Sequence, residues 1–248
     1  MNRLLFVFLA LALACESGTV KNDLPPDQLS IKQRLERIRE TYRPAECFSA
    51  AFGVESKQAG QSAQSADGSL RVDNLNKRVR LYFVEPIFGI TLSHVTIRDG
   101  FVYVGSPRDA TVQIPLDRFV LSGLGNNTIR LPFRLFQDLM YGRIPEEVFS
   151  TQARYTAKEN RLLVNYEDAI SRIAYEFEGD RLRLVNYYHK SDRANARADL
   201  TGAFRNTPFP QTVELAGWID GPPEKMTARF STVDMNAVCK DAQFPINQ

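Results

Sequence analysis

The feature that most constrains this chain is the number of short segments in which apolar and polar residues alternate. Residues 78–84 show the pattern clearly, with Val79, Leu81 and Phe83 on one face and Arg78 and Arg80 on the other. Such alternation is typical of a strand that is buried on one side. Similar segments predict eleven to thirteen short antiparallel strands. They are expected at residues 47–56, 70–74, 78–84, 90–98, 101–105, 111–116, 152–157, 161–166, 171–178, 181–189, 199–205, 212–218 and 225–233.

Two segments have helical periodicity instead. In residues 30–42 an apolar stripe is formed by Ile31, Leu35, Ile38 and Tyr42. The opposite face is expected in solvent, and its charged residues are Lys32, Arg34, Glu36, Arg37, Arg39 and Glu40. A second helix is expected at residues 131–142, with Pro132 near its start and Gly142 at its end.

Two helices cannot cover both faces of so many strands, so the sheet must curl around its own apolar face. The expected fold is therefore mainly β, an open antiparallel β-barrel or half-barrel, with the helices as a lid over the opening. Residues 57–69 are polar and low in complexity, which predicts a long flexible hairpin tip.

Charge and motifs exclude several classes of function. The 31 basic and 29 acidic residues nearly balance, which does not favour a nucleic-acid-binding protein. Two histidines and three cysteines are too few for a Cys/His-rich zinc module. The chain has no P-loop, G-x-S-x-G or H-E-x-x-H motif. His94 is expected to be a hydrogen-bonded strand residue and His189 an exposed one, so no enzyme activity, metal or cofactor is expected.

The first residues indicate the compartment. Arg3 precedes an apolar run at residues 4–14, which is followed by Cys15, as in a secretory signal. The run is too short to cross a bilayer. Ala12-Leu13-Ala14-Cys15 resembles the bacterial lipobox, so Cys15 is expected to carry covalent lipid; the alternative is a plain signal peptide. The expected organisation is a signal peptide at 1–14, a lipidated cysteine and tether at 15–29, and one domain at 30–248.

Cys47 and Cys239 are left over if Cys15 is acylated. In an oxidising compartment they can form a disulfide between the start and the end of the domain. The alternative is a pair of buried free thiols.

The middle of the chain carries motifs in a recognisable order. A strand at residues 79–84 leads into Pro86-Ile87-Phe88-Gly89, and later Leu131-Pro132 begins a helix that ends at Gly142-Arg143-Ile144-Pro145. This order resembles the LolA/LolB lipoprotein-carrier family, particularly its lipid-anchored receptor branch, LolB. Two departures are a turn with one residue more than the family's Pro-Leu-Gly, and a longer chain after about residue 208.

The resemblance implies an incomplete barrel with a helical lid and an apolar cavity that shields acyl chains. Shielding matters because each methylene exposed to water costs about 0.8 kcal/mol. The alternative is that the apolar side chains fill one another's space. The residues expected in the cavity wall are Val79, Leu81, Phe83, Ile90, Leu92, Val112, Ile114, Phe133, Phe136, Leu139, Met140, Leu162, Val164, Ile173, Tyr175 and Phe177.

The resemblance also implies a membrane-docking loop at Pro86, Ile87, Phe88 and Gly89, in which Phe88 best matches an exposed apolar residue of the receptor branch. The alternative is a turn folded back onto the core. The implied partners are acylated lipoprotein cargo, a soluble periplasmic LolA-like carrier and membrane lipid.

The function expected from these arguments is that of an outer-membrane lipoprotein, facing the periplasm, which accepts acylated lipoproteins and inserts them into the membrane. One rival has the same fold but binds another lipid or senses envelope stress. Another is a surface lipoprotein whose barrel is a scaffold for protein contacts.

Overall fold

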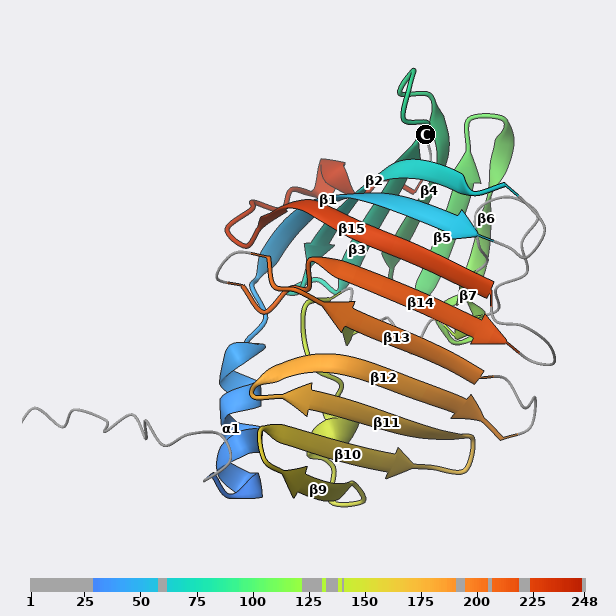
Figure 1. Ribbon diagram of the computed structural model, residues 1–248. Helices are drawn as coiled ribbons and strands as arrows, with labels where there is room; N and C mark the ends of the chain where they lie inside the picture. Colours follow the sequence, from blue (N-terminus) through green and yellow to red (C-terminus); the bar gives the residue numbers. More distant parts are fainter. Residues whose placement is uncertain are drawn as a thin grey trace, which may run out of the picture.

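One antiparallel sheet makes up most of the computed structural model (Figure 1). The structure describes residues 29–57, 62–121, 131–132, 138–139, 141–190, 195–204, 207–218 and 224–246. Within these residues the sheet has 13 strands, in the order β6-β5-β4-β3-β2-β1-β15-β14-β13-β12-β11-β10-β9. Two short strands, β7 and β8, pair separately. The mainly β architecture agrees with the sequence prediction.

The strands follow the alternating segments closely. Their bounds are β1 Cys47–Lys57, β2 Gln64–Asp73, β3 Arg78–Val84, β4 Thr91–Arg98, β5 Phe101–Ser106, β6 Asp109–Pro115, β7 Val120–Leu121, β8 Leu131–Pro132, β9 Arg154–Lys158, β10 Arg161–Glu167, β11 Ser171–Glu178, β12 Arg181–His189, β13 Asn195–Thr201, β14 Thr212–Trp218 and β15 Glu224–Asp234.

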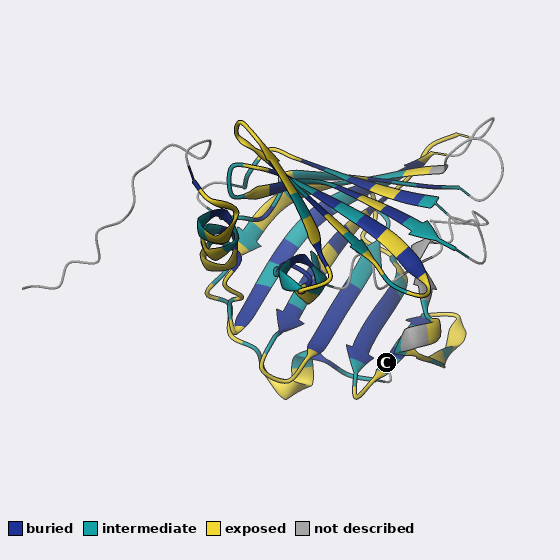
Figure 2. Cartoon of the chain, turned by 90° about the horizontal axis from the view of Figure 1, so that it is seen from below, coloured by how far each residue is buried: buried dark blue, intermediate teal, exposed yellow. Residues whose placement is uncertain are grey.

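The two halves of the sheet meet where β1 pairs with β15. In Figure 1, β9–β15 lie in front and β3–β6 pass behind them, so the sheet bends over on itself. The outermost strands, β6 and β9, do not pair with each other, and the sheet therefore stays open rather than closing into a barrel. Buried residues occur along strands of both halves of the sheet (Figure 2).

The helix α1 (Ile31–Thr41) begins at a capping box, in which Ser30 and Gln33 each satisfy the other's backbone N–H. Its apolar stripe packs against the inner face of the sheet through Ile38, which is fully buried. Arg34 was expected in solvent and is instead buried. Its guanidinium donates to the carbonyl oxygens of Leu29, Glu159 and Arg161 at 3.3, 2.6 and 3.1 Å, so it ties α1 to the turn between β9 and β10.

Two apolar clusters fill the inside of the bend. The first joins the inner faces of β10–β14 to α1 and to the 3₁₀ turn η3 (Glu146–Phe149). The second lies on the inner faces of β1–β5 and includes Phe48, Tyr141 and Phe209. Met226 of β15 contacts both clusters. The inner face is thus packed at both ends, and the junction of the two clusters lies near β15.

Three local predictions need correction. Residues 64–69 were expected in a flexible tip, but they belong to β2 and pair with β1. Leu131 and Pro132 were expected to start a helix, but they form β8. The strand expected at 199–205 lies earlier, at Asn195–Thr201. Most of the second predicted helix, including Phe133, Phe136 and Met140, lies outside the described residues, as do residues 1–28 with Cys15.

The C-terminal segment, residues 235–246, crosses the outer face of β3 and β4. A disulfide joins Cys239 to Cys47, which are 192 residues apart. Beyond it, Asp241 accepts a bond from Arg78 at 2.6 Å, and the carbonyl oxygen of Pro245 accepts one from Arg80 at 3.0 Å. Phe244 is fully buried, 4.7 Å below the Arg78 guanidinium. The segment therefore covers arginines that alternate with the apolar residues of β3.

Candidate functional site

An apolar hollow of about 150 Å³ lies on the inner face of the sheet where the two clusters meet. Strands from both halves form its wall, together with the loop at Pro208–Pro210 and the segment around Gly142. An apolar space of about this size accepts a group as large as benzene. Its lining residues are Tyr42, Phe52, Val54, Leu70, Leu81, Phe83, Leu139, Gly142, Arg143, Leu200, Pro208, Phe209, Pro210, Val213, Leu215, Met226, Ala228 and Phe230.

Aromatic rings shape one side of the hollow. Gly68 sits in register between Phe52 and Phe83, and the missing side chain lets the two rings approach to 6.0 Å. A Cβ atom on Gly68 would lie 2.4 Å from the Phe52 ring. Phe230 packs against Phe52 at 5.5 Å and against Phe209 at 4.9 Å. These ring-to-ring contacts fix the positions of the aromatic side chains, so they define the shape of the hollow on this side.

A charged chamber of about 1030 Å³ adjoins the hollow, as shown by Tyr42 and Arg143, which line both spaces. Its other charged residues are Arg39, Arg43, Asp138, Glu146 and Glu147. The Arg143 guanidinium lies 3.3 Å from the Asp138 carboxylate and stacks on Tyr141 at 4.6 Å. The site is therefore apolar at one end and charged, with both signs present, at the other.

Tyr42 stands at the boundary between the two spaces. Its hydroxyl accepts a hydrogen bond from the backbone N–H of Leu182 at 2.9 Å. Burial raises the pKa of the Tyr42 hydroxyl above its ordinary value. Tyr42 is therefore a neutral, fixed wall residue at neutral pH.

The residues expected in a cavity wall are found in several places. Leu81, Phe83 and Leu139 line the hollow. Val79 is buried in the second cluster, and the first cluster contains Leu162, Val164, Ile173, Tyr175 and Phe177, which pack against one another and not around the hollow.

The remaining wall candidates that are described lie away from the hollow. Ile90, Leu92 and Val112 are exposed, because the first two follow a hairpin tip and Val112 belongs to the edge strand β6. Ile114, also on β6, is half-buried and does not line the hollow.

Sequence reasoning missed most of the lining from β1, β14 and β15, including Phe52, Val213, Ala228 and Phe230. Alternation does place these residues on one face of each strand. It cannot show that β1 and β15 are neighbours, and only that pairing brings the residues together.

The turn after β3 presents two large apolar side chains to solvent. Ile87 and Phe88 are 80% and 78% exposed, so this turn is not folded back onto the core. Oε2 of Glu85 accepts the backbone N–H groups of Ile87 and Phe88 at 3.0 and 2.6 Å. Gly89 takes a φ of +66°, which suits glycine, and its N–H donates to the Glu85 carbonyl at 2.9 Å. The turn is therefore well ordered by its own hydrogen bonds.

His94 is a buried strand residue on the outer face of β4, as expected for a structural histidine. Its Nε2 has no hydrogen-bond partner among the described residues, contrary to expectation. Burial, with the nearby charge of Arg80, lowers the pKa of His94. His189, expected to be exposed, is half-buried at the end of β12.

Among the described residues, no group of three or more His, Cys, Asp or Glu side chains could hold a metal ion. None of the helices in the described ranges has both the length and the apolar character needed to cross a bilayer.

Comparison with known proteins identifies the fold. No protein-family model and no curated protein matches the sequence. A LolA superfamily protein from Nitrosomonas europaea is similar in structure, with a TM-score of 0.57 and 11% identity over 88% of this chain and 98% of the other.

Two other solved structures are also similar. A putative outer membrane lipoprotein-sorting protein domain from Vibrio parahaemolyticus has a TM-score of 0.59 and 9% identity, over 86% of this chain and 94% of the other. A DUF1329 family protein from Desulfovibrio piger has a TM-score of 0.56 and 12% identity, over 90% of this chain and 98% of the other. At these identities the similarity shows a LolA-like fold.

Proposed function

We propose that this protein is a non-enzymatic outer-membrane lipoprotein that binds the acyl chains of other lipoproteins on the inner face of its sheet and releases them into the membrane. Cys15 would carry the lipid anchor, and a soluble LolA-like carrier would supply the cargo. Transfer would follow differences in affinity and would need no cofactor. Two of the structural neighbours are described as a LolA superfamily protein and a lipoprotein-sorting domain, which supports this choice.

The observation that carries the proposal is an apolar hollow that opens beside a charged chamber. An amphiphile can place its hydrocarbon end in the hollow and its polar end among the charges around Arg143. The hollow, at about 150 Å³, accepts only the end of an acyl chain. A longer stretch of chain would enter only if lining residues moved apart, and we assign that movement to Leu139 and Gly142, which line the hollow.

The first test fills the hollow. Ala228→Phe places a ring in a space that accepts a benzene-sized group, so the fold should tolerate it. Each methylene of the acyl chain that the new ring keeps out of the hollow loses about 0.8 kcal/mol of binding free energy. Exclusion of two methylenes therefore weakens acyl binding about tenfold. The measurement is titration of anthroyloxy-labelled palmitate into the whole chain carrying Cys15→Ser, which keeps it free of the anchor.

The matched control is Ala216→Phe on β14, whose side chain points to the outer face. It should bind the labelled palmitate as the unsubstituted chain does. Equal binding by the Ala228→Phe variant would contradict the hollow as the acyl site. Depletion of the protein in cells separates the proposal from its rivals: lipoproteins that still reach the outer membrane would point to another lipid cargo.

The second test concerns the turn at Ile87 and Phe88. Burying a phenylalanine side chain in lipid is favourable by about 1.5–3 kcal/mol. Phe88→Glu should therefore weaken binding of the Cys15→Ser chain to phosphatidylcholine vesicles by about tenfold or more, and slow delivery of lipoproteins. Leu75→Glu is the control, because Leu75 is 69% exposed in the turn at the other end of β3. Similar effects of the two substitutions would argue against a docking role for this turn.

A further inference from the structure

The outer face of β10–β14 carries two neighbouring rows of polar and aromatic side chains. Strand register aligns each row across the sheet. Most of these residues point away from the apolar clusters, because they alternate along the strands with Val164, Ile173, Tyr187 and Ala196 of the first cluster. Glu167 and Trp218 share that face by register, because they pair with Arg172 and Asn195. One row is Glu167, Arg172, Tyr188, Asn195 and Trp218; the other includes Asn165, Ala174 and Asn186.

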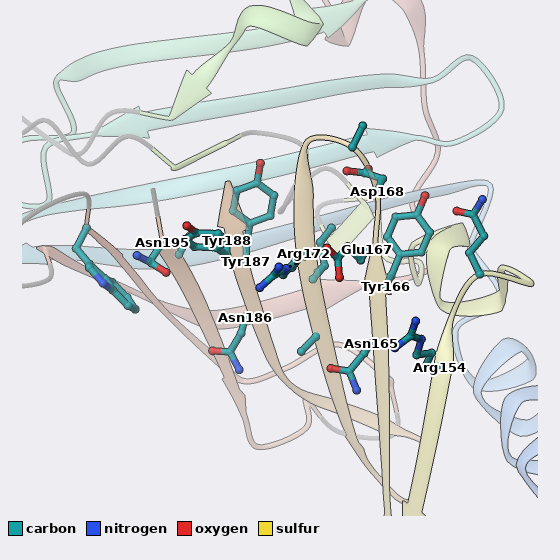
Figure 3. A pocket seen from close by; sticks show the side chains of 16 residues that line it. Arg154, Asn165, Tyr166, Glu167, Asp168, Arg172, Asn186, Tyr187, Tyr188 and Asn195 are labelled. Carbon is teal, nitrogen blue, oxygen red and sulfur yellow. Dashed lines mark hydrogen bonds and ion pairs between the residues drawn. The ribbon is translucent and has the colours of Figure 1, made fainter. Parts of the chain in front are cut away.

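The two rows line a hollow of about 870 Å³, shown in Figure 3. Asn165 and Asn186 point to the same side of the strands in this view. Ala174 lies between them in register, and its small side chain leaves space between the two amides. The lining also includes Tyr166 and three residues of the first apolar cluster, Ile173, Tyr187 and Ala196, and it shares no residue with the apolar hollow on the inner face.

Ion pairs are common on the outer face, for example between Arg183 and Glu178 and between Arg197 and Asp199. The hollow has such a pair as well, between Arg172 and Glu167, but four of its other side chains are not engaged in this way. The side chains of Asn165, Asn186, Tyr188 and Trp218 make no hydrogen bond within the part of the chain that the structure describes. Two amides and two aromatic side chains are therefore available to a ligand.

The charges in the hollow favour a neutral ligand. Nε of Arg172 lies 3.1 Å from the Glu167 carboxylate, and Lys190 lies 2.8 Å from the same group. Among the residues that line the hollow, the two arginines, Arg154 and Arg172, are matched by two carboxylates, Glu167 and Asp168. An anionic ligand would have to displace these pairs or rely on Arg154 alone.

We propose that this hollow binds a neutral oligosaccharide chain. A sugar ring has apolar C–H faces and an edge of hydroxyl groups that both donate and accept. Aromatic rings cover such faces, and an amide offers a donor and an acceptor together. Tyr188 and Trp218 lie two strands apart, a separation of about 10 Å, which suits the first and third of three consecutive sugar rings in an extended chain. Asn186 and Asn165 are placed to bond the hydroxyl edges beside them.

The test uses the only tryptophan of the chain, Trp218, as the reporter. Chitotetraose and cellotetraose, both neutral oligosaccharides, are titrated into the whole chain carrying Cys15→Ser. Saturable change in tryptophan emission with either sugar, matched by calorimetry, is the expected result. Tyr188→Ala and Asn186→Ala should each weaken that binding tenfold or more.

Two controls make the result specific. Tyr103→Ala removes an outer-face tyrosine on β5, in the other half of the sheet, and should leave sugar affinity unchanged. Binding of labelled palmitate should be unchanged in Tyr188→Ala, which also shows that the variant is folded. The proposal is overturned if neither sugar changes the emission at millimolar concentration, if Tyr188→Ala binds as the parent does, or if only an extended peptide binds.

Discussion

Replacing Cys239 with serine is expected to lower the free energy of unfolding by about 2–5 kcal/mol. The disulfide closes a loop between residues that are 192 positions apart, so its loss gives the unfolded chain many more conformations. It also frees the C-terminal segment, whose Asp241 and Pro245 bind Arg78 and Arg80 over the outer face of β3. The measurement is urea unfolding followed by circular dichroism. The dependence of the unfolding free energy on urea concentration is fitted separately for each protein.

The reduced parent protein is the control for this prediction. Treatment with a thiol reductant should lower its unfolding midpoint to near that of Cys239→Ser, and should leave the midpoint of the variant unchanged. If the reductant has no effect on the parent, the bond between Cys47 and Cys239 does not stabilise the fold and this account is wrong.

A second large effect is expected from Phe48→Ala. Phe48 is fully buried on β1, where its ring packs edge to face on Phe209 at 5.4 Å and lies against Gly142. Truncation of a buried phenylalanine costs about 3–5 kcal/mol, since it removes apolar contacts and leaves a cavity. The loss here also removes the contact between β1 and Gly142, which lines the apolar hollow. Urea unfolding again gives the change in stability.

Phe88→Ala is the matched control, because it makes the same truncation at a side chain that is 78% exposed. It should change the free energy of unfolding by no more than about 0.5 kcal/mol. Equal effects of the two substitutions would mean that burial at Phe48 does not contribute as the structure indicates.

The sequence was sufficient for the features that depend on near neighbours in the chain. Alternation located most strands within a few residues, and β3 (Arg78–Val84) at its observed bounds, because residues on a strand point to opposite faces in turn. The apolar spacing in α1 predicted its buried Ile38, and Pro86 with Gly89 predicted the turn that exposes Phe88. The prediction failed at residues 64–69, where a polar, small-residue sequence is held in β2 by its pairing with β1.

Only the tertiary structure decided which strands meet, and the candidate sites depend on that. The apolar hollow exists because β15 pairs with β1 and brings Ala228 and Phe230 beside Phe52. Arg34 is buried because the turn between β9 and β10 brings two carbonyl oxygens to it. The hollow on the outer face, which we propose binds an oligosaccharide, depends on the register of the five strands β10–β14. Alternation tells which side of a strand a residue occupies, but strand order and register come from packing between segments far apart in the chain.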